Sequence, residues 1–364
     1  MYMKRILQIV PSLNINAGMM SVIMNYYRHI DRNKIQFDFL YFFEMDQTYK
    51  DEILSLGGSV YSLGKPSFKH SFQAKYNQFL KQHKGEFAAI HCHPIFAPEI
   101  FSHLAKKNGI KHVIAHSHST KYSDNKLSAI RNYFINMFVG FCATDFMACS
   151  PEAAKLYGKR DVKILRNSIE GEKYKFSLEE RKKIRKEFGI DDSKVVIGHV
   201  GRFVTQKNHK MVIDIYASYH KNNDNSVMML AGDGPLKNEM EKYASLKVKD
   251  GSILFLGRRS DIPQLLSAFD VFILPSLFEG APVSAVEAQF AGLPCLLSDT
   301  ITKSINATDC EYLSINKPPE FWAKKVIIDK NIHRRIERYK RMIDAGFDIK
   351  DTAKYLEDYY LSLK

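Results

Sequence analysis

The most informative segment of the chain is Val271-Phe-Ile-Leu-Pro-Ser-Leu-Phe-Glu-Gly-Ala-Pro-Val-Ser-Ala-Val-Glu-Ala-Gln-Phe-Ala-Gly-Leu-Pro294. Its four apolar residues at the start are typical of a buried strand, and the small residues that follow predict a tight connection into a helix. Pro282 suits the first helical position, because its φ is fixed and its missing N–H is not needed there. Gly292 and Pro294 form a usual helix ending. We therefore predict a strand, a loop and a short helix.

Two glutamates, Glu279 and Glu287, lie around the start of this helix. The N–H groups of Val283 and Ser284 have no acceptor within a helix, and the positive end of the helix dipole makes such a start an anion site. Glu287 lies further along, where a carboxylate is suited to hydroxyl groups. Since glutamates at this spacing are common on exposed helices, the surrounding pattern carries the prediction: a phosphate beside a diol, as in a nucleotide-sugar.

Apolar runs alternate with helix-like segments along the whole chain, which predicts parallel sheets covered on both faces. Strands are expected near residues 5–10, 37–42, 58–61, 88–91, 112–115, 145–148, 162–165, 195–200, 226–230, 253–256, 271–274 and 294–297. The predicted class is α/β, with two doubly wound Rossmann-like domains at residues 1–168 and 169–347. A final helix at about 348–364 is expected to cross back onto the first domain. Ligands in this architecture bind at the carboxyl ends of the strands.

The composition is that of an ordinary folded protein, with 45% hydrophobic, 12% aromatic and 26% charged residues among 364. Five cysteines without a Cys-x-x-Cys pair make a disulfide framework improbable and favour a reducing cytoplasm. The apolar run at the N-terminus ends at Pro11, too early for a signal peptide. The most apolar stretch, residues 133–149, is interrupted by polar residues, so no transmembrane segment is expected.

Positive charge is concentrated in the first domain. Residues 1–168 hold 22 Lys and Arg against 12 Asp and Glu, a net +10 of the chain's +13. A basic domain attracts nucleic acid, anionic lipid headgroups or anionic substrates, and a merely solvated lysine-rich surface is an equally good interpretation.

Two glycine-containing loops follow predicted strands of the second domain. The loop Gly201-Arg-Phe-Val-Thr-Gln-Lys-Asn208 offers Arg202 and Lys207, a planar fork and a point charge that suit a diphosphate. Two exposed surface cations are the alternative. The loop Ala231-Gly-Asp-Gly-Pro235 permits a tight turn but is no phosphate-binding motif, so a plain strand-to-helix turn is the better interpretation.

Histidines follow two predicted strands of the first domain. In Ile114-Ala-His-Ser-His-Ser-Thr120, His116 and His118 share one face of an extended strand. His118, nearer the tip, is expected to enter the cleft and donate a hydrogen bond to a substrate, with His116 packed beneath it. The pair in His91-Cys-His93 could suggest a metal, but nothing in the sequence completes a ligand set, so strand-end packing is favoured.

Taken together, these motifs resemble the retaining glycosyltransferases of family 4, the "group 1" transferases with the GT-B fold, in which two Rossmann-like domains face across a cleft. The resemblance is most specific in the second domain and looser in the first, and it is strongest toward bacterial enzymes that build capsular or exopolysaccharide repeat units. It is carried by Gly201-Arg202, Lys207, Gly232-Asp-Gly-Pro235, Pro275-Ser-Leu-Phe-Glu279-Gly280, Glu287-Ala288, Ala17-Gly18 and Ala115-His-Ser-His118.

The resemblance implies a role for each matching residue of the second domain. Arg202 and Lys207 would hold the donor diphosphate, Glu287 the ribose hydroxyls, and Glu279 would lie near the transferred sugar. Arg258 is a weaker candidate near the base. Backbone contacts to sugar and phosphate would come from Gly280, Ala281, Pro282 and Val283.

In the first domain the resemblance implies that His118 contacts the sugar or the acceptor and that Gly18 lets the first loop approach the diphosphate. The chain departs from the family in two places. Ala17-Gly18 stands where a Gly-Gly pair is frequent, and Arg166-Asn167-Ser168 stands where Pro-Asn-Gly is frequent.

The implied activity is transfer of a sugar, with retention of configuration, from a nucleotide diphosphate sugar, most commonly a uridine diphosphate sugar, to a hydroxyl of a lipid-linked or saccharide acceptor. No Asp-x-Asp triplet occurs in the sequence, so neither an essential metal nor a cofactor is expected. The basic domain would meet the inner face of the cell membrane without insertion. The helix expected at residues 126–139 is one candidate contact, and an ordinary packed helix is the alternative.

Three other functions are compatible with parts of the sequence. A nucleotide-sugar epimerase could use the same fold, and a phosphorylase would need a lysine carrying pyridoxal phosphate, for which no segment argues. A basic nucleic-acid-binding protein is supported by charge alone, because no helix-turn-helix, zinc finger or ribonucleoprotein signature is found.

Overall fold

The computed structural model describes residues 3–15, 17–122, 126–329 and 331–364. The chain divides into two compact units, which we call the first unit (residues 1–167 with 349–364) and the second unit (residues 168–348). These limits lie one residue from the expected ones.

The first unit contains a seven-stranded sheet in the order β3-β2-β1-β4-β5-β6-β7, whose paired strands run parallel. The direction of strand succession reverses between β1 and β4, which places a topological switch point at the carboxyl ends of these strands. The strands are β1 (Lys4–Ile9), β2 (Ile35–Tyr41), β3 (Val60–Ser62), β4 (Phe87–Cys92), β5 (His112–Ser117), β6 (Asp145–Ala148) and β7 (Lys163–Ile164).

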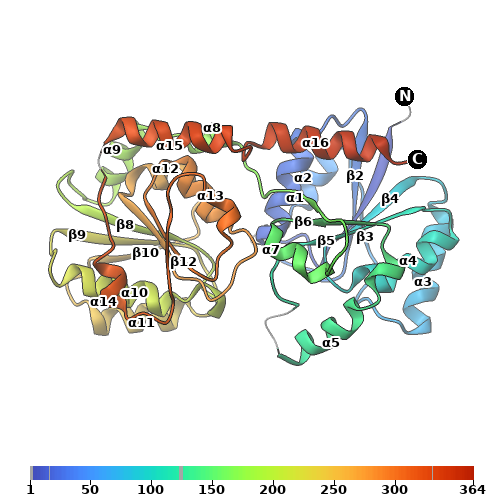
Figure 1. The fold of residues 1–364 in the computed structure, drawn as a ribbon, viewed down its shortest axis with the longest axis horizontal. Helices are drawn as coiled ribbons and strands as arrows, with labels where there is room; N and C mark the ends of the chain where they lie inside the picture. Colours follow the sequence, from blue (N-terminus) through green and yellow to red (C-terminus); the bar gives the residue numbers. More distant parts are fainter. Residues whose placement is uncertain (1–2, 16, 123–125, 330) are drawn as a thin grey trace. The chain divides into compact units, whose positions relative to one another are not determined.

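Helices cover both faces of this sheet, α1 and α16 on one side and α3 and α4 on the other (Figure 1). The C-terminal helix α16 belongs to the first unit, where the ring of Tyr360 packs 5.8 Å from that of Phe37. The helices are α1 (Gly18–His29), α2 (Lys50–Ser55), α3 (His70–Gln82), α4 (Ala97–Lys107), α5 (Lys126–Asn136), α6 (Val139–Cys142), α7 (Pro151–Ala154) and α16 (Ile349–Ser362).

The second unit contains a six-stranded sheet in the order β10-β9-β8-β11-β12-β13, again with parallel pairing. Its switch point lies between β8 and β11. The strands are β8 (Val195–Val200), β9 (Ser226–Ala231), β10 (Ile253–Gly257), β11 (Val271–Leu274), β12 (Cys295–Ser298) and β13 (Glu311–Leu313).

Helices α10, α11 and α14 bury one face of the second sheet, and α9, α12, α13 and α15 lie on the other (Figure 1). The helices of the second unit are α8 (Gly171–Tyr174), α9 (Leu178–Glu187), α10 (His209–His220), α11 (Lys237–Lys247), α12 (Ile262–Ala268), α13 (Val283–Phe290), α14 (Pro319–Ala323) and α15 (Ile332–Asp344).

The predicted fold class, two doubly wound parallel sheets, is confirmed, and four details differ. Strand β13 and helices α8 and α15 were not expected, and the helix expected at 126–139 is divided into α5 and α6. β13 is a three-residue edge strand that exists through pairing with β12. Helix α15 has apolar residues at helical spacing (Ile332, Ile336, Tyr339 and Ile343), so its pattern was present in the sequence and was overlooked.

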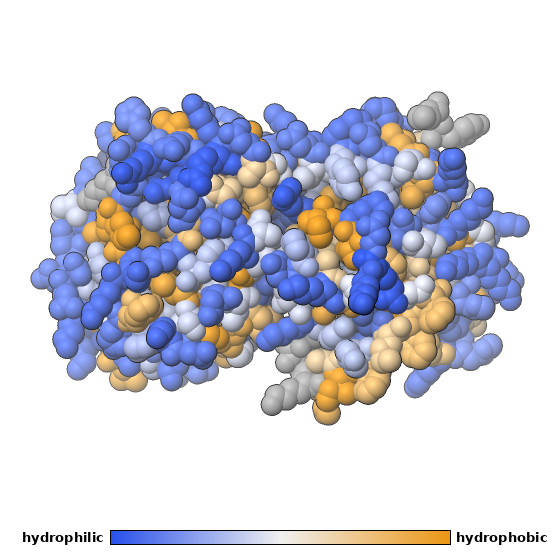
Figure 2. Space-filling view, in the orientation of Figure 1, coloured by the Kyte–Doolittle hydropathy of each residue, from blue (hydrophilic) through white to orange (hydrophobic). Residues whose placement is uncertain are grey.

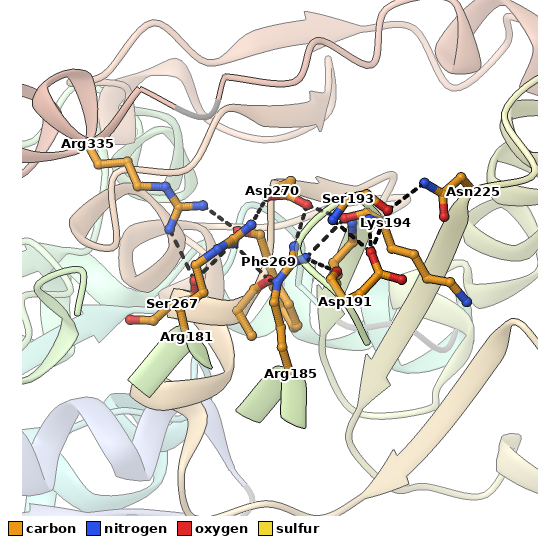
Figure 3. A network of polar contacts seen from close by, with 12 residues as sticks. Arg181, Arg185, Asp191, Ser193, Lys194, Asn225, Ser267, Phe269, Asp270 and Arg335 are labelled. Atoms are coloured by element: carbon orange, nitrogen blue, oxygen red, sulfur yellow. Dashed lines mark hydrogen bonds and ion pairs between the residues drawn. The ribbon is translucent and has the colours of Figure 1, made fainter. Parts of the chain in front are cut away.

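An ionised network holds the amino ends of β8 and β11 (Figure 3). The buried carboxylate of Asp270 accepts hydrogen bonds from Arg181 at 2.7 Å and Arg185 at 2.6 Å, and from the backbone N–H of Val196 at 2.8 Å. The guanidinium of Arg335 donates to the carbonyls that end α12, and burial lowers its pKa to about 9. Since breaking one member of such a network leaves other buried charges uncompensated, we assign it to the frame of the second unit.

Within the part of the chain that the structure describes, no helix combines the length and the apolar character that crossing a bilayer requires.

Candidate functional site

The loops that follow β8 and β11 are joined to each other at the carboxyl edge of the second sheet. The backbone N–H of Leu277 donates to the carbonyl of Gln206 at 2.8 Å, and the Gln206 side chain donates to the carbonyl of Phe278 at 3.0 Å. Asn208 donates to the carbonyl of Pro275 at 3.2 Å. Because β8 and β11 are neighbours at the switch point, two sequence motifs far apart in the chain form one surface.

Lys207 and Glu279 form an ion pair on this surface. The Lys207 Nζ lies 2.7 Å from Glu279 Oε1, and the side chains are only 15% and 9% exposed. Gln206 donates to the other carboxylate oxygen at 3.2 Å. The sequence suggested two free cations, but the structure pairs one of them. Arg202 is exposed, and its guanidinium has no hydrogen bond or ion pair among the described residues.

The glycine turn after β9 has a packing role. Gly232 adopts φ 146°, and a Cβ there would lie 2.0 Å from the carbonyl oxygen of Gly201. Only glycine therefore lets the loop after β9 pass the loop after β8. In the same turn, Asp233 pairs with Arg258 across neighbouring strand ends, with 3.4 Å between Oδ2 and Nε and both side chains about half exposed. Arg258 thus lies at the β9–β10 side of this edge.

Helix α13 begins at Val283, one residue later than predicted. Pro282 is therefore its N-cap and not its first helical residue. Gly280, Ala281 and Pro282 are buried where the chain enters the helix. The helix start therefore presents backbone N–H groups beside the joined loops.

Glu287 lies one turn into α13, where its Oε1 accepts a hydrogen bond from the hydroxyl of Tyr174 at 2.8 Å. Burial raises the pKa of Glu287, and the Tyr174 hydrogen bond and the charge of Lys207 act against that rise. Lys207 is thus close enough to influence both glutamates. Tyr174 comes from α8, a segment without a motif, and sequence reasoning missed it.

The carboxyl edge of the first sheet carries four histidines. His91 in β4 and His116 in β5 are buried, and His93 and His118 lie just beyond the ends of the same strands. Ring centroids of His116 and His118 are 4.1 Å apart, and those of His91 and His93 are 4.5 Å apart. His116 lies beneath, as its position in the strand predicts, while Ser117 faces the other way and donates to the carbonyl of Ala153.

Hydrogen bonds determine the tautomer of His118. The Gln8 Oε1 faces His93 Nε2 at 2.8 Å, so this nitrogen carries the proton and His93 Nδ1 is the acceptor. His118 Nε2 therefore donates to His93 Nδ1, also at 2.8 Å. In a neutral ring the buried Nδ1 of His118 is left with a lone pair, and it has no hydrogen-bond partner among the described residues. His118 thus offers an acceptor, where the sequence-based expectation was a donor.

The hydrogen bonds run in the same donor-to-acceptor direction from Gln8 onward to His116. The Gln8 amide donates to the Tyr360 hydroxyl at 3.4 Å, which in turn donates to His91 Nδ1 at 2.6 Å. His91 Nε2 then donates to His116 Nδ1 at 3.1 Å. Burial lowers the pKa of His91 to about 3 and that of His118 to about 4, so a neutral chain of imidazoles is expected at neutral pH.

His91, His93 and His116 also have ring nitrogens within 4.8 Å of one another. The expectation that nothing completes a ligand set around His91 and His93 is therefore wrong, because β5 supplies a third imidazole. His91 Nε2 and His116 Nδ1 are joined by a hydrogen bond, and the two nitrogens of His93 are bonded to His118 and Gln8, so these contacts account for the arrangement of the rings as packing.

A hollow of about 310 Å³ opens beside His118 in the first unit. Ser119, Lys121, Tyr122 and Met19 are among its lining residues. At Gly18, the first residue of α1, an added Cβ would meet nothing within 4 Å. None of the described residues makes a contact that requires glycine at this position.

Two doubly wound units, each with polar groups gathered at the switch point of its sheet, define the fold of GT-B glycosyltransferases. A family model described as "Glycosyl transferases group 1" matches residues 180–346. The chain is 33% identical to "Putative glycosyltransferase EpsF" of Bacillus subtilis (strain 168) over 336 residues, 89% of this chain and 87% of that protein. The chain belongs to the group 1 glycosyltransferase family.

Further relatives agree with this assignment. The chain is 26% identical to an Escherichia coli protein named "UDP-Gal:alpha-D-GlcNAc-diphosphoundecaprenol alpha-1,3-galactosyltransferase", over 77% of this chain and 76% of that protein. Among solved structures, Anabaena Alr3699/HepE in complex with UDP and glucose superimposes with a TM-score of 0.79 at 17% identity, covering 99% of this chain and 100% of that one. At that identity the likeness concerns the fold.

Proposed function

We propose that this protein is a retaining, family 4 glycosyltransferase that moves a sugar from a uridine diphosphate sugar to a hydroxyl of a lipid-linked or saccharide acceptor in bacterial cell-surface polysaccharide synthesis. The observation that carries the proposal is the joined pair of loops after β8 and β11, which gathers Arg202, Lys207 and the start of α13 at one switch point. Brought together by the sheet, these groups suit a diphosphate.

The departing diphosphate is stabilised, in this proposal, by Arg202, Lys207 and the N–H groups at the start of α13. Arg202 is exposed and pairs with none of the described residues, and Lys207 is held in place by Glu279 at 2.7 Å. An incoming diphosphate would share the Lys207 charge with Glu279, which leaves that carboxylate available for the hydroxyls of the sugar. Cations and helix dipole together supply the charge compensation, so no essential metal or cofactor is part of the proposal.

The ribose is assigned to Glu287. Its carboxylate is oriented by the Tyr174 hydroxyl at 2.8 Å, and a carboxylate has further acceptor capacity for a diol. Tyr174 is therefore a positioning residue for the nucleoside.

The sugar or the acceptor hydroxyl is assigned to His118 Nδ1, the free acceptor at the end of the imidazole chain. The names of two relatives, from Escherichia coli and Campylobacter jejuni, specify diphosphoundecaprenol acceptors, which supports a lipid-linked acceptor here. The relative from Salmonella typhi is named for Vi polysaccharide biosynthesis, which supports a cell-surface product. A cytoplasmic enzyme at the inner face of the membrane fits these acceptors.

The test is a thermal-shift screen of nucleotide diphosphate sugars, followed by a transfer assay in which NMR identifies the anomer of the product. We expect stabilisation by a uridine diphosphate sugar, retained configuration and full activity in a chelator. Release of free sugar without acceptor would indicate an epimerase. Stabilisation by oligonucleotides and by no donor would indicate the nucleic-acid-binding alternative.

A further inference from the structure

A row of large apolar side chains faces the solvent on α5, on α6 and in the turn between them, in the first unit. Each of the seven is between 50 and 84% exposed, and Figure 2 shows the apolar residues gathered along α5. We call this set the apolar stripe: Leu127, Ile130, Tyr133, Phe134, Met137, Phe138 and Phe141. Exposed apolar residues are usually scattered singly, and a contiguous set marks an interaction site.

Helix α5 is amphipathic, and its polar face is turned toward the rest of the first unit. Asn132 and Asn136, each 5% exposed, anchor α5 by donating to the carbonyls of Tyr122 at 2.8 Å and Leu156 at 2.7 Å. The stripe residues recur every three or four positions and so occupy the opposite face. Specific hydrogen bonds therefore hold the helix with its apolar side outward, and loose packing does not explain the exposure.

The surroundings of the stripe are cationic. Residues 126–144 contain Lys126 and Arg131 and no acidic residue. On the neighbouring α4, Lys106 and Lys107 are exposed, and the Lys106 Nζ lies 3.3 Å from the carbonyl of Phe141. An apolar row with flanking cations matches the interface of an anionic bilayer. A second copy of this chain is disfavoured, because a symmetric contact would bring the same cations face to face.

The stripe also adjoins the hollow of His118. The ring of Tyr133 packs edge-on against Tyr122 at 5.5 Å, and Tyr122 lines that hollow. A hydroxyl at the head of a lipid embedded in the bilayer would therefore reach His118 from the side that carries the stripe.

We infer that the apolar stripe docks the first unit onto an anionic lipid bilayer, with its side chains inserted into the headgroup layer. The inference rests on the proposed lipid-linked acceptor, which gives the docking its purpose. The sequence-based expectation was a membrane contact without insertion, and here side chains insert. The partner is the bilayer surface itself, and none of the described helices is long and apolar enough to cross it.

The experiment is flotation of the full chain with phosphatidylcholine vesicles that contain or lack phosphatidylglycerol, at low salt. We expect binding to the anionic vesicles. The double variant Phe134→Ser, Phe141→Ser is expected to weaken it about tenfold or more, because two inserted rings are lost. The matched control is Phe43→Ser, Phe68→Ser, which replaces two exposed phenylalanines elsewhere in the first unit and should bind like the parent.

Absence of binding to anionic vesicles, or binding unchanged in the Phe134→Ser, Phe141→Ser variant, would overturn the inference. Self-association that this variant abolishes, measured by sedimentation, would show that a second copy is the partner. Because flotation uses no donor, it is independent of the proposed reaction. Transfer to a water-soluble acceptor tests that reaction separately and is expected to be equal in the parent and both double variants.

Discussion

The two units have the same doubly wound sheet but line its carboxyl edge with different chemistry. In the second unit the edge is charged, with Arg202, the Lys207–Glu279 pair and the start of a helix. In the first unit it is a neutral chain of imidazoles that ends in His118 Nδ1, an acceptor that has no partner among the described residues. One fold can thus carry cations at one sheet edge and neutral hydrogen-bonding groups at another, because loops and strand ends, and not the sheet, supply the chemistry.

The largest expected effect concerns the ionised frame of the second unit. Asp270→Asn should lower the free energy of unfolding by about 3–5 kcal/mol, since the buried guanidinium groups of Arg181 and Arg185 lose their carboxylate. Urea unfolding measures the change, and hydrogen exchange should assign it to the second unit. The control Asp309→Asn removes a partner of the exposed Arg341 and should cost less than about 1 kcal/mol. Equal losses in the two variants would contradict the assignment.

The next effect tests the charged edge. Arg202→Ala should reduce kcat by a factor on the order of 10²–10³, or about 2.7–4 kcal/mol, without loss of stability because the side chain is exposed. Lys207→Ala should reduce kcat similarly and also stability, because it leaves the buried Glu279 carboxylate without its cation. Steady-state kinetics and thermal unfolding separate the two results. Unchanged turnover in Arg202→Ala would remove the diphosphate assignment.

A change to acid pH tests the same comparison. A histidine that is buried in its neutral form keeps its full contribution to stability only above its unfolded pKa of about 6.5. With the folded pKa of His118 at about 4 and that of His91 at about 3, stability is retained above pH 6.5 and lost as the pH falls toward those values. At pH 4.5 each of these histidines would lower the free energy of unfolding by up to about 2.7 kcal/mol.

Hydrogen exchange between pH 7 and pH 4.5 should therefore show the first unit, with four such histidines, opening before the second, in which burial lowers the pKa of His199 to about 4 and of His209 to about 2. His118→Gln, which cannot be protonated, should reduce the loss in the first unit. A second unit that opens first would break the comparison.

The smallest effect concerns the direction of the imidazole chain. Tyr360→Phe removes the hydroxyl between Gln8 and His91 and should cost about 0.5–1.5 kcal/mol. Nitrogen-15 NMR should show a changed tautomer population of His91, while donor binding to the second unit stays the same. The control is Tyr355→Phe on the same helix, whose ring is 45% exposed. An identical spectrum in Tyr360→Phe would contradict the derived hydrogen-bond direction.

The charged edge of the second unit was readable from the sequence because its groups are contiguous with strand ends. Residues 201–208 and 275–287 each follow an apolar strand directly, and the parallel-sheet rule puts such segments at one edge. The pairing of Lys207 with Glu279 was not readable, because it joins residues 72 positions apart through the contact of two loops. Tyr174 was missed for the same reason, since no local pattern marks the partner of Glu287.

The sequence by itself determined the two parallel sheets, since alternating apolar strands and helices permit little else, and it determined the positions of the chemical motifs along the chain. Only the tertiary structure decided which charges neutralise one another, which nitrogen of His118 is left free and which face of α5 is turned outward. The physical reason is that the apolar pattern reports burial along one segment. Hydrogen-bond direction, ion pairing and the orientation of a helix depend on partners that only folding brings near.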